Sequence, residues 1–304
     1  MVPRPPRAPG PGEVQLRVEA CALGQWDWNL LTLDAPPRLP LVPGAEAVGV
    51  VEAAGEGAAY SVGARVLVTP LAQSCGACEA CRAGDARWCA AARFVGTHVD
   101  GALGTHLTLP AQHLVPAPAS AADVAACLGG SAWTAVGAVR ATGLTSGARC
   151  GVFGVGGVGH LVVQLAAARG LSVMADDVDP ERRALGIALG ASPMRAGLDA
   201  AVVCTPSMQA LQHAVKLVRP GGVVVVVGSS PTGRVDLPLA DVVARGVSVR
   251  GSVLGSSRDL ADALVLASSG ALRPRTTPAP LDEAVERLWK LRDGGFTGRL
   301  VFTP

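Results

Sequence analysis

The chain has 304 residues, of which 16% are charged, and its formal net charge at pH 7 is +2. This balance excludes the strongly basic or acidic face that binds nucleic acid or an anionic membrane. The length is sufficient for about two domains and a sizeable core. The opening residues, MVPRPPRAPGPG, lack the apolar run of a secretion signal, and we predict no membrane span, so a cytoplasmic location is expected.

The N-terminal part of the chain predicts short strands. Val14, Leu16 and Val18 alternate with polar residues over Glu13–Ala20, which is typical of a half-buried strand. A proline-rich loop follows and ends at Pro43. Four further strands are expected, at 47–53, 63–69, 102–109 and 114–116.

A cluster of cysteines predicts a metal site. The pattern C-x2-C-x2-C-x7-C begins at Cys75 and ends at Cys89. Four thiolates this close together can surround one tetrahedral Zn2+ completely, which leaves no open position for a substrate. An iron–sulfur cluster is the alternative, but the chain has neither the following proline nor a second set of cysteines. We therefore predict one structural zinc ion per chain in a lobe at 72–92, bound by Cys75, Cys78, Cys81 and Cys89.

The remaining cysteines lie scattered in apolar segments. In a reducing compartment they are expected to be buried free thiols rather than disulfides. They are Cys21, Cys127, Cys150 and Cys204.

A dinucleotide-binding pattern occupies the middle of the chain. Residues 150–160, CGVFGVGGVGH, form an apolar strand that leads into a glycine loop and then into a helix at 161–169. The G-x-G-x-x-G spacing lets the chain turn, lets the backbone approach a pyrophosphate and lets helix and strand pack closely. The N–H groups at the helix start would hold the phosphates. The predicted cofactor-binding residues are Gly154, Val155, Gly156, Gly157, Val158, Gly159, Asp177, Arg182, Thr205 and Gly228.

The acid after the second strand of this pattern predicts the cofactor. Asp177 follows a strand at 171–175 and is placed to bind the ribose hydroxyls of NAD(H). A carboxylate repels the 2′-phosphate of NADP(H), so NAD(H) is favoured. Arg182 and Arg183 are able to accommodate that phosphate, and NADP(H) therefore stays open as an alternative.

The rest of the chain alternates helices with buried strands. The strand at 222–228 contains five consecutive valines, as expected in a parallel sheet that is buried on both faces. Asp179 and Pro180 form a typical helix start. Helices are expected at 121–139 with a break at Gly129-Gly130, and at 180–189, 207–218, 259–268 and 281–292. Strands are expected at 199–204, 222–228, 247–254 and 298–302.

Taken in order, these segments resemble the medium-chain dehydrogenase/reductase family, the zinc-type alcohol dehydrogenases in particular. The likeness runs from about Pro11 to the C-terminus. It is carried by GEVQLRVEAC at 12–21, PGAE at 43–46, GARV at 63–66, the four-cysteine lobe, DGA at 100–102, GVGGVGH at 154–160 and RPGG at 219–222.

The resemblance implies an α/β plus β fold. A GroES-like barrel domain at 1–134 and 271–304 would be interrupted by a Rossmann-type, doubly wound parallel-sheet domain at 135–270. It also implies an active site for a small-molecule substrate in the cleft between the domains. A homodimer is implied as well, formed through the strand near Val247–Leu254.

The chain departs from the family pattern at the catalytic metal. The three positions that carry catalytic-zinc ligands in zinc-type members fall on Gly24, Ala45 and Gly130, whose side chains cannot bind a metal. The two proton-relay positions become Trp26 and Asn29. We therefore expect no catalytic zinc.

Three other residues are candidates for a substitute ligand set. Cys21, Glu46 and Cys127 lie near the lost positions in sequence, but each cysteine is three residues upstream of the family's ligand position. Ligand distances must be correct within about 0.2 Å, so this set is not favoured.

Two segments of the family pattern are missing. There is no room for a strand hairpin before Pro11, and only eight residues separate Leu189 from Leu198, where a strand and a crossover helix would normally lie. A parallel crossover takes about a dozen residues or more. We therefore predict that the third strand of the Rossmann sheet and its helix are lost or vestigial, and that the adenine pocket is more open.

Without a Lewis acid, reduction of an unactivated ketone loses several kcal/mol of transition-state stabilisation. We therefore predict NADH-dependent reduction of an activated C=C or C=N bond, as in zinc-free relatives of the family. Candidate hydrogen-bond donors are Trp26, Gln25 and Asn29, while Glu46 and Asp27 would hold water or a cationic substrate, or fix the neighbouring backbone. Two alternatives stay open: a zinc-dependent alcohol dehydrogenase with other ligands, and a non-catalytic NADH-binding scaffold.

Overall fold

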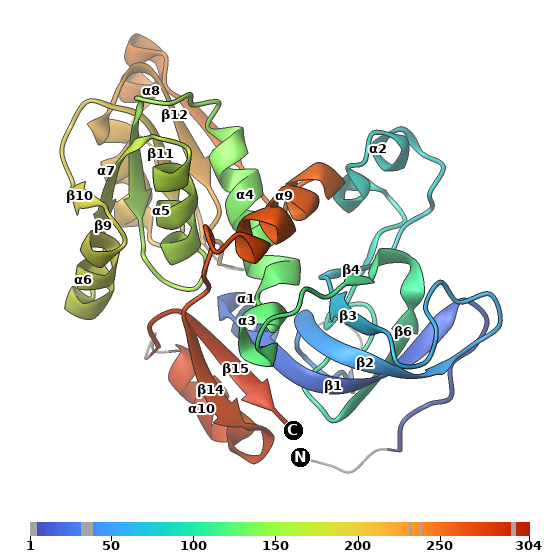
Figure 1. Cartoon of the computed structure of the whole chain (residues 1–304). Coiled ribbons are helices and arrows are strands. Elements are labelled where there is room, and N and C mark those ends of the chain that lie inside the picture. The colour runs from blue at the N-terminus through green and yellow to red at the C-terminus, as the bar shows by residue number, and fades with distance from the viewer. Residues whose placement is uncertain (1–4, 32–38, 231–232, 238, 293–295) are drawn as a thin grey trace. The chain divides into compact units, whose positions relative to one another are not determined.

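A computed structural model of the chain describes residues 5–31, 39–230, 233–237, 239–292 and 296–304 (Figure 1). The chain divides into two compact units, which we name by their sheets. The mixed-sheet unit comprises Met1–Gly130, Ser256–Arg258 and Thr276–Pro304, and the parallel-sheet unit comprises Ser131–Gly255 and Asp259–Arg275. Most of the predicted proline-rich loop before Pro43 lies outside the described residues.

The central strand of the mixed-sheet unit is β1 (Glu13–Leu23). Val14 and Leu16 are fully buried, whereas Arg17 is exposed on the other face, so the predicted alternation is confirmed. The strand continues past the predicted end at Ala20 because residues 20–23 are buried and pair with neighbouring strands.

The sheet of this unit follows the order β14-β15-β1-β2-β3-β7, with β6 pairing to β1 outside that path. Only the β14–β15 pair is parallel. The other strands of the unit are β2 (Glu46–Ala54), β3 (Arg65–Val68), β4 (Leu71–Gln73), β5 (Arg93–Phe94), β6 (His106–Pro110), β7 (Val115–Pro116), β14 (Thr276–Pro280) and β15 (Arg299–Thr303). Its helices are α1 (Gln25–Leu31), α2 (Glu79–Arg82), η1 (Ala86–Trp88), η2 (Ala111–His113), α3 (Ala122–Ala126), η4 (Leu281–Glu283) and α10 (Ala284–Arg292).

The parallel-sheet unit contains six strands in the order β10-β9-β8-β11-β12-β13. All neighbouring pairs are parallel. The strands are β8 (Arg149–Phe153), β9 (Ser172–Asp176), β10 (Ser192–Pro193), β11 (Leu198–Val203), β12 (Val218–Val226) and β13 (Ser248–Gly251). The helices are α4 (Trp133–Ala141), α5 (Gly159–Ala168), α6 (Pro180–Ala188), α7 (Met208–Leu217), α8 (Leu239–Arg245) and α9 (Ser257–Ser268), of which Ser257 and Arg258 belong to the mixed-sheet unit.

The third strand of the parallel sheet is reduced rather than lost. β10 has two residues and pairs with Met174 and Ala175 of β9. Of the two expected outcomes, lost or vestigial, the structure shows a vestigial strand, and the crossover is vestigial as well because residues 194–197 contain no helix. A Cβ at Gly151 of β8 would lie 3.4 Å from the sulfur of Met194, so the short connection packs over the strand that Gly151 belongs to.

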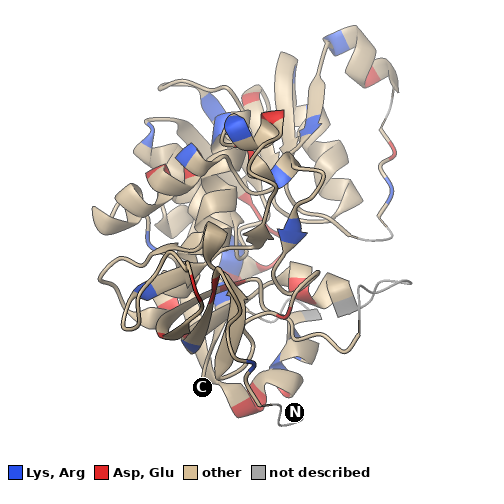
Figure 2. Ribbon diagram, turned by 90° about the vertical axis from the view of Figure 1, so that its right-hand side faces the viewer, with Lys and Arg blue, Asp and Glu red and all other residues tan. Residues whose placement is uncertain are grey.

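One helical run is long and apolar enough to cross a bilayer. It covers Ala122–Ala141, and 78% of its most apolar window is buried inside the protein, so it is a core helix. The predicted break at Gly129-Gly130 is a π-helical turn at Leu128–Ala132. Residues of both charge signs occur in both units (Figure 2).

Candidate functional site

The glycine loop joins β8 to α5 at the carboxyl end of the parallel sheet. Gly154 has a φ of 87°, a conformation that favours glycine. A Cβ at Gly159 would lie 1.8 Å from the carbonyl oxygen of Gly154, so only glycine permits this close approach of helix and strand. A Cβ at Gly156 would meet nothing within 4 Å, which leaves the middle of the loop open to a ligand.

Three predicted cofactor-binding positions meet at this edge of the sheet. Thr205 follows β11 and Gly228 follows β12, and a Cβ at Gly228 would lie 2.3 Å from the carbonyl carbon of Thr205. A Cβ at Gly154 would lie 3.2 Å from the Cβ of Thr205. The carboxyl ends of β8, β11 and β12 therefore come together, which is where open α/β sheets bind ligands.

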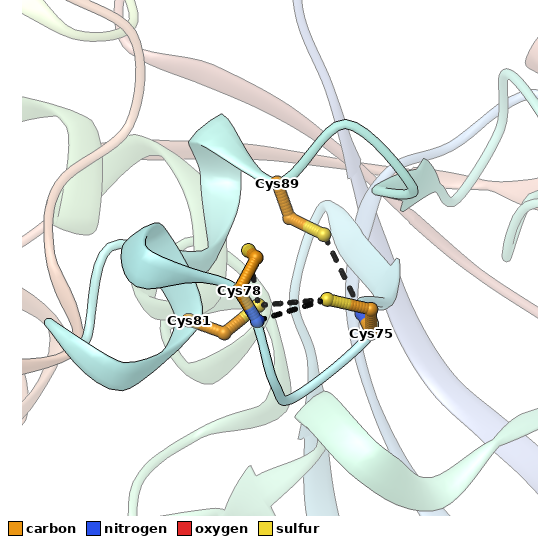
Figure 3. A group of neighbouring side chains, drawn as sticks. All are labelled: Cys75, Cys78, Cys81 and Cys89. Carbon is orange, nitrogen blue, oxygen red and sulfur yellow. Dashed lines mark hydrogen bonds between the residues drawn. The ribbon is translucent and has the colours of Figure 1, made fainter.

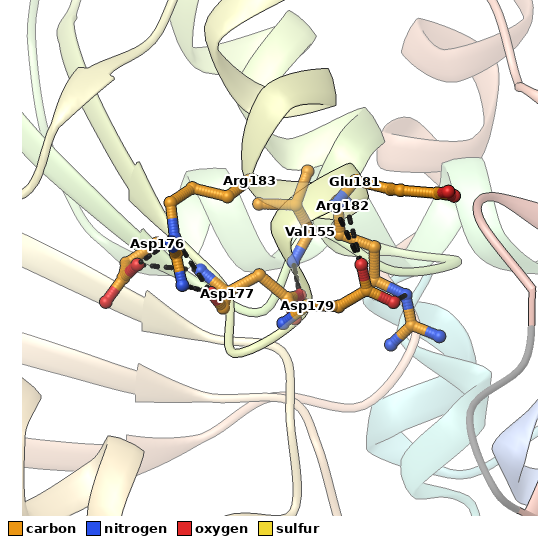
Figure 4. A network of polar contacts seen from close by, with 7 residues as sticks. All are labelled: Val155, Asp176, Asp177, Asp179, Glu181, Arg182 and Arg183. Atoms are coloured by element: carbon orange, nitrogen blue, oxygen red, sulfur yellow. Dashed lines mark hydrogen bonds and ion pairs between the residues drawn. The ribbon is translucent and has the colours of Figure 1, made fainter.

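The predicted ribose-binding acid is fixed against the glycine loop (Figure 4). The Asp177 side chain is buried, and its Oδ2 accepts a hydrogen bond of 2.7 Å from the Val155 N–H. Its Oδ1 accepts another, of 3.0 Å, from the Asp179 N–H. The N–H groups of Val155 and Asp179 thus hold the carboxylate in one orientation.

Both arginines that were considered for a 2′-phosphate are engaged with local acids. Arg183 pairs with Asp176 at 3.1 Å and donates to the carbonyl oxygen of Asp177. Arg182 lies 3.8 Å from the carboxylate of Asp179, which caps α6. A 2′-phosphate would have to displace these contacts.

His160 is the first residue after the last loop glycine. The structure buries it completely. Its Nδ1 lies 2.8 Å from the Gly156 carbonyl oxygen, and its Nε2 accepts a 3.0 Å hydrogen bond from the Arg275 N–H. Because a backbone N–H can only donate, Nε2 is the acceptor and Nδ1 carries the proton. Burial lowers the pKa of His160 to about 4, so the ring is neutral at physiological pH.

The four lobe cysteines form a compact thiol cluster (Figure 3). The sulfurs all lie within 4.8 Å of one another. The backbone N–H groups of Ala77 and Cys78 lower the pKa of Cys75 to about 6, which favours the thiolate that a metal binds. Four thiols in this arrangement fit a closed, structural zinc site.

Two of the positions at which catalytic ligands were expected to be missing, Gly24 and Gly130, lie beside a buried ion pair. Arg299 of β15 pairs with Glu46 of β2, and both side chains are less than a tenth exposed. A Cβ at Gly24 would lie 2.2 Å from an Arg299 nitrogen, and one at Gly130 would lie 2.4 Å from a Glu46 oxygen. The ion pair therefore occupies space that side chains at 24 and 130 would need. Burial lowers the pKa of Arg299 to about 10.

Asp27 fixes the neighbouring backbone. Its carboxylate accepts hydrogen bonds of 2.9 Å from the Gly24 N–H and 3.0 Å from the Gly44 N–H. Burial raises the pKa of this carboxyl. Of the roles considered for Asp27, the structural one is the role that these contacts describe.

The predicted hydrogen-bond donors lie on α1 in two different environments. Gln25 and Trp26 are exposed, and 52% of Trp26 is accessible, whereas Asn29 is buried. The Gln25 amide nitrogen lies 3.4 Å from the Asn29 side-chain oxygen.

A substitute metal set does not form. Within the described part of the chain, the lobe cysteines are the only group of three or more His, Cys, Asp or Glu residues whose ligand atoms gather closely enough for a metal. Cys21, Glu46 and Cys127 are therefore not brought together as ligands. A catalytic zinc does not fit the residues present at 24, 45 and 130.

Sequence reasoning missed Arg299. The sequence predicts only that Arg299 belongs to the strand at 298–302, because nothing in its local sequence indicates that it pairs with Glu46. The register of β15 against β1, with Leu300 opposite Leu23, is what brings Arg299 to Gly24.

Comparisons with known proteins match this architecture along the chain. A model of the alcohol dehydrogenase GroES-like domain matches residues 10–119, and a model of zinc-binding dehydrogenases matches residues 157–269. An alcohol dehydrogenase from Geobacillus stearothermophilus is 34% identical over 312 residues, which cover 95% of this chain and 91% of the relative.

Solved structures agree in fold. The crystal structure of the alcohol dehydrogenase from Aeropyrum pernix is similar with a TM-score of 0.92 and 28% identity, covering 100% of this chain and 96% of that one. Acetophenone reductase from Geotrichum candidum, solved in complex with NAD, has a TM-score of 0.91 and 27% identity, covering 98% of this chain and 91% of that one. The resemblance and the fold class predicted from the sequence are confirmed.

We predict that Cys78→Ser abolishes zinc binding and destabilises the chain. Loss of one of four ligands opens the closed site, and we expect a cost of about 2–3 kcal/mol, which lowers the Tm by roughly 5–10 °C. Zinc content by mass spectrometry and thermal unfolding measure both effects. Cys204→Ala, which changes a thiol outside the lobe, should keep the zinc, and zinc loss from Cys78→Ser without loss of stability would contradict the structural role.

We also predict that protonation of His160 lowers the free energy of unfolding of the chain in acid. Its pKa is about 4 in the folded chain, against a usual value of 6.5. Between these values the unfolded chain binds more protons, so this contribution to stability is complete above pH 6.5 and is lost as the pH falls toward 4, by about 3 kcal/mol in total. Urea unfolding at pH 7, 5.5 and 4.5 should show this loss in the wild type. The same series on His160→Gln isolates it, since other titrating groups are common to both chains, and identical pH slopes would contradict the prediction.

Proposed function

Since this chain belongs to the medium-chain, zinc-type alcohol dehydrogenase family and is an NAD(P)-dependent oxidoreductase, we propose that it uses NAD(H) and works without a catalytic zinc. The observation that carries the proposal is the residue set around the Glu46–Arg299 pair, where Gly24, Ala45 and Gly130 offer no side-chain ligand.

The contacts of Asp177 support NAD(H) over NADP(H). Its carboxylate is fixed beside the glycine loop and would repel a 2′-phosphate. Arg182 and Arg183, the nearest cations in sequence, already face Asp179 and Asp176. NAD(H) requires no rearrangement of these pairs.

The absence of metal ligands favours an easily reduced substrate. Bound nicotinamide supplies a hydride from its C4 atom to an electrophilic carbon. In a conjugated enone, enal or iminium ion the accepted charge is spread over several atoms, so the reaction depends less on a Lewis acid. We propose reduction of such an activated C=C or C=N bond in a small molecule.

Residues of α1 would provide the polar contacts to that substrate. The exposed side chains of Trp26 and Gln25 offer N–H donors, and Asn29 holds Gln25 from the buried side of the helix. Glu46 is committed to Arg299, so we assign it to charge balance and positioning rather than to proton transfer. The proton that completes reduction of a C=C bond would come from water.

A second candidate is favoured by the names of the relatives. They include several alcohol dehydrogenases and an acetophenone reductase, and these names support interconversion of an alcohol and a carbonyl compound better than reduction of an activated double bond. This candidate requires a zinc-dependent site with ligands other than the three expected positions.

We further propose a cytoplasmic homodimer formed through β13. This strand is at the edge of the parallel sheet and all four of its residues are exposed. An exposed strand edge requires covering or pairing, and a second copy of β13 would provide both.

The number of zinc ions per chain separates the two candidates. We expect one zinc per wild-type chain by mass spectrometry, with hydride transfer to an enone or iminium substrate. Two zincs per chain, with activity lost when one is removed, would establish the second candidate instead. Cofactor binding without turnover across enone, imine, ketone and alcohol panels would contradict both and indicate a scaffold.

We predict that Asp177→Ala weakens NADH binding by about 10-fold and reduces discrimination against NADPH. The variant loses the ribose contact and the charge that repels the 2′-phosphate. Fluorescence titration with both cofactors measures the two dissociation constants. Asp199→Ala serves as a control because Asp199 pairs with Arg219 and Arg149 at the opposite end of the strands. An unchanged NADH/NADPH preference in Asp177→Ala would contradict the assignment of the ribose contact.

A further inference from the structure

Helix α5 holds a distant segment of the parallel-sheet unit through its side chains. We call residues 272–275 the return segment, because they are the last residues of this unit before the chain re-enters the mixed-sheet unit at Thr276. Gln164 accepts a 2.8 Å hydrogen bond from the Arg273 N–H and donates one of 3.1 Å to the Arg273 carbonyl oxygen. Leu272 is 1% exposed and anchors the start of the segment.

His160 lies one helical turn before Gln164 and makes a further hydrogen bond to the return segment. Its Nε2 accepts from the Arg275 N–H at 3.0 Å. Residues four apart lie on one face of a helix, so the two side chains pair with alternate residues of the return segment much as a strand would. These hydrogen bonds tie the return segment to α5, the helix that follows the nucleotide-binding loop.

The other ring nitrogen of His160 reaches the loop itself. Nδ1–H donates to the Gly156 carbonyl oxygen at 2.8 Å, and this oxygen also accepts from the His160 N–H at 3.2 Å. Only the neutral ring with its proton on Nδ1 satisfies both Gly156 and Arg275. His160 therefore bridges the middle glycine of the loop and the end of the return segment.

The bond to Gly156 determines the direction of a loop N–H. A trans peptide unit is planar, and its N–H points opposite to its C=O. Because the Gly156 carbonyl is directed toward the buried imidazole, the Gly157 N–H is directed away from it. A Cβ at Gly156 would meet nothing within 4 Å, so a ligand has room to approach this part of the loop.

We propose that His160 is a positioning residue that couples the dinucleotide loop to the return segment. One ring nitrogen orients the Gly156–Gly157 peptide for the pyrophosphate of the cofactor, and the other holds the Arg275 amide. Cofactor binding and the order of the return segment are then linked, and linkage is reciprocal: what stabilises one stabilises the other. The proposal rests on nucleotide binding at this loop and is independent of the catalytic metal.

Two variants separate the hydrogen bond of the His160 ring to Gly156 from its hydrogen bond to Arg275. In His160→Asn the side-chain amide takes the position of Nδ1 and keeps the bond to Gly156, but it is too short to reach Arg275. In His160→Gln the side chain reaches the position of Nε2 and keeps an acceptor for Arg275, but it leaves Gly156 with the backbone bond alone. Gln164→Leu is the matched control, because it loosens the return segment without touching the loop.

The first measurement is the dissociation constant for NADH. We expect His160→Gln to weaken binding by about 3- to 10-fold, the effect of one buried hydrogen bond. His160→Asn and Gln164→Leu should weaken it by no more than about 2-fold, since they act on the loop only through its linkage to the return segment. Thermal unfolding of each variant confirms that it is folded. Equal affinities in all four chains, or equal losses in both His160 variants, would overturn the orienting role.

The second measurement is hydrogen exchange at the amides of Arg273 and Arg275, with and without NADH. In the wild type, NADH should slow exchange at both amides, and His160→Asn should abolish the effect at Arg275. The wild-type comparison needs no variant to fold, and unchanged exchange there would overturn the coupling. Failure of the wild type to bind NADH would contradict the cofactor assignment instead, and the titration reveals this separately.

Discussion

The buried pair of Glu46 and Arg299 is the interaction around which the mixed-sheet unit is arranged. It joins β2, near the start of the chain, to β15 at its end, and β1 lies between these two strands. Two charges taken out of water are tolerated only when each meets the other closely, and removal of either partner would leave an unpaired buried charge at a cost of about 3–5 kcal/mol. A Cβ at Gly24 would meet the guanidinium and one at Gly130 would meet the carboxylate, so both glycines leave room for the pair.

In the parallel-sheet unit, glycines serve a different purpose: they allow close approach of backbone to backbone at the ends of the strands. Its strands β8 and β11 are almost entirely apolar and buried, and the predicted cofactor-binding positions lie where the strands end. There the glycines at 154, 159 and 228 let backbone approach backbone, which leaves N–H groups rather than side chains to face a ligand. Asp177 and His160 then fix this backbone from opposite sides of the loop, one through Val155 and the other through Gly156.

Local patterns predicted most of the fold and part of the site. Alternation identified β1, valine runs identified β12, and cysteine and glycine spacings indicated a compact thiol cluster and a glycine loop, because each signal is contained in a short window. The two-residue strand β10 was too short to show a period of two. Arg299 and the Arg275 partner of His160 could not be predicted, since their contacts depend on strand register and on a backbone amide far along the chain.

The four-cysteine lobe and the region around Gly24 differ in the interactions that hold them together. The four-cysteine lobe has a 3-residue β4, a 2-residue β5 and a 4-residue α2 with no buried residue, so it contains little apolar core of its own. A closed zinc site, which the four cysteines fit, would supply the stability that such a segment lacks. The region around Gly24 is instead bounded by three paired strands and a buried ion pair, which are contacts among the protein's own residues.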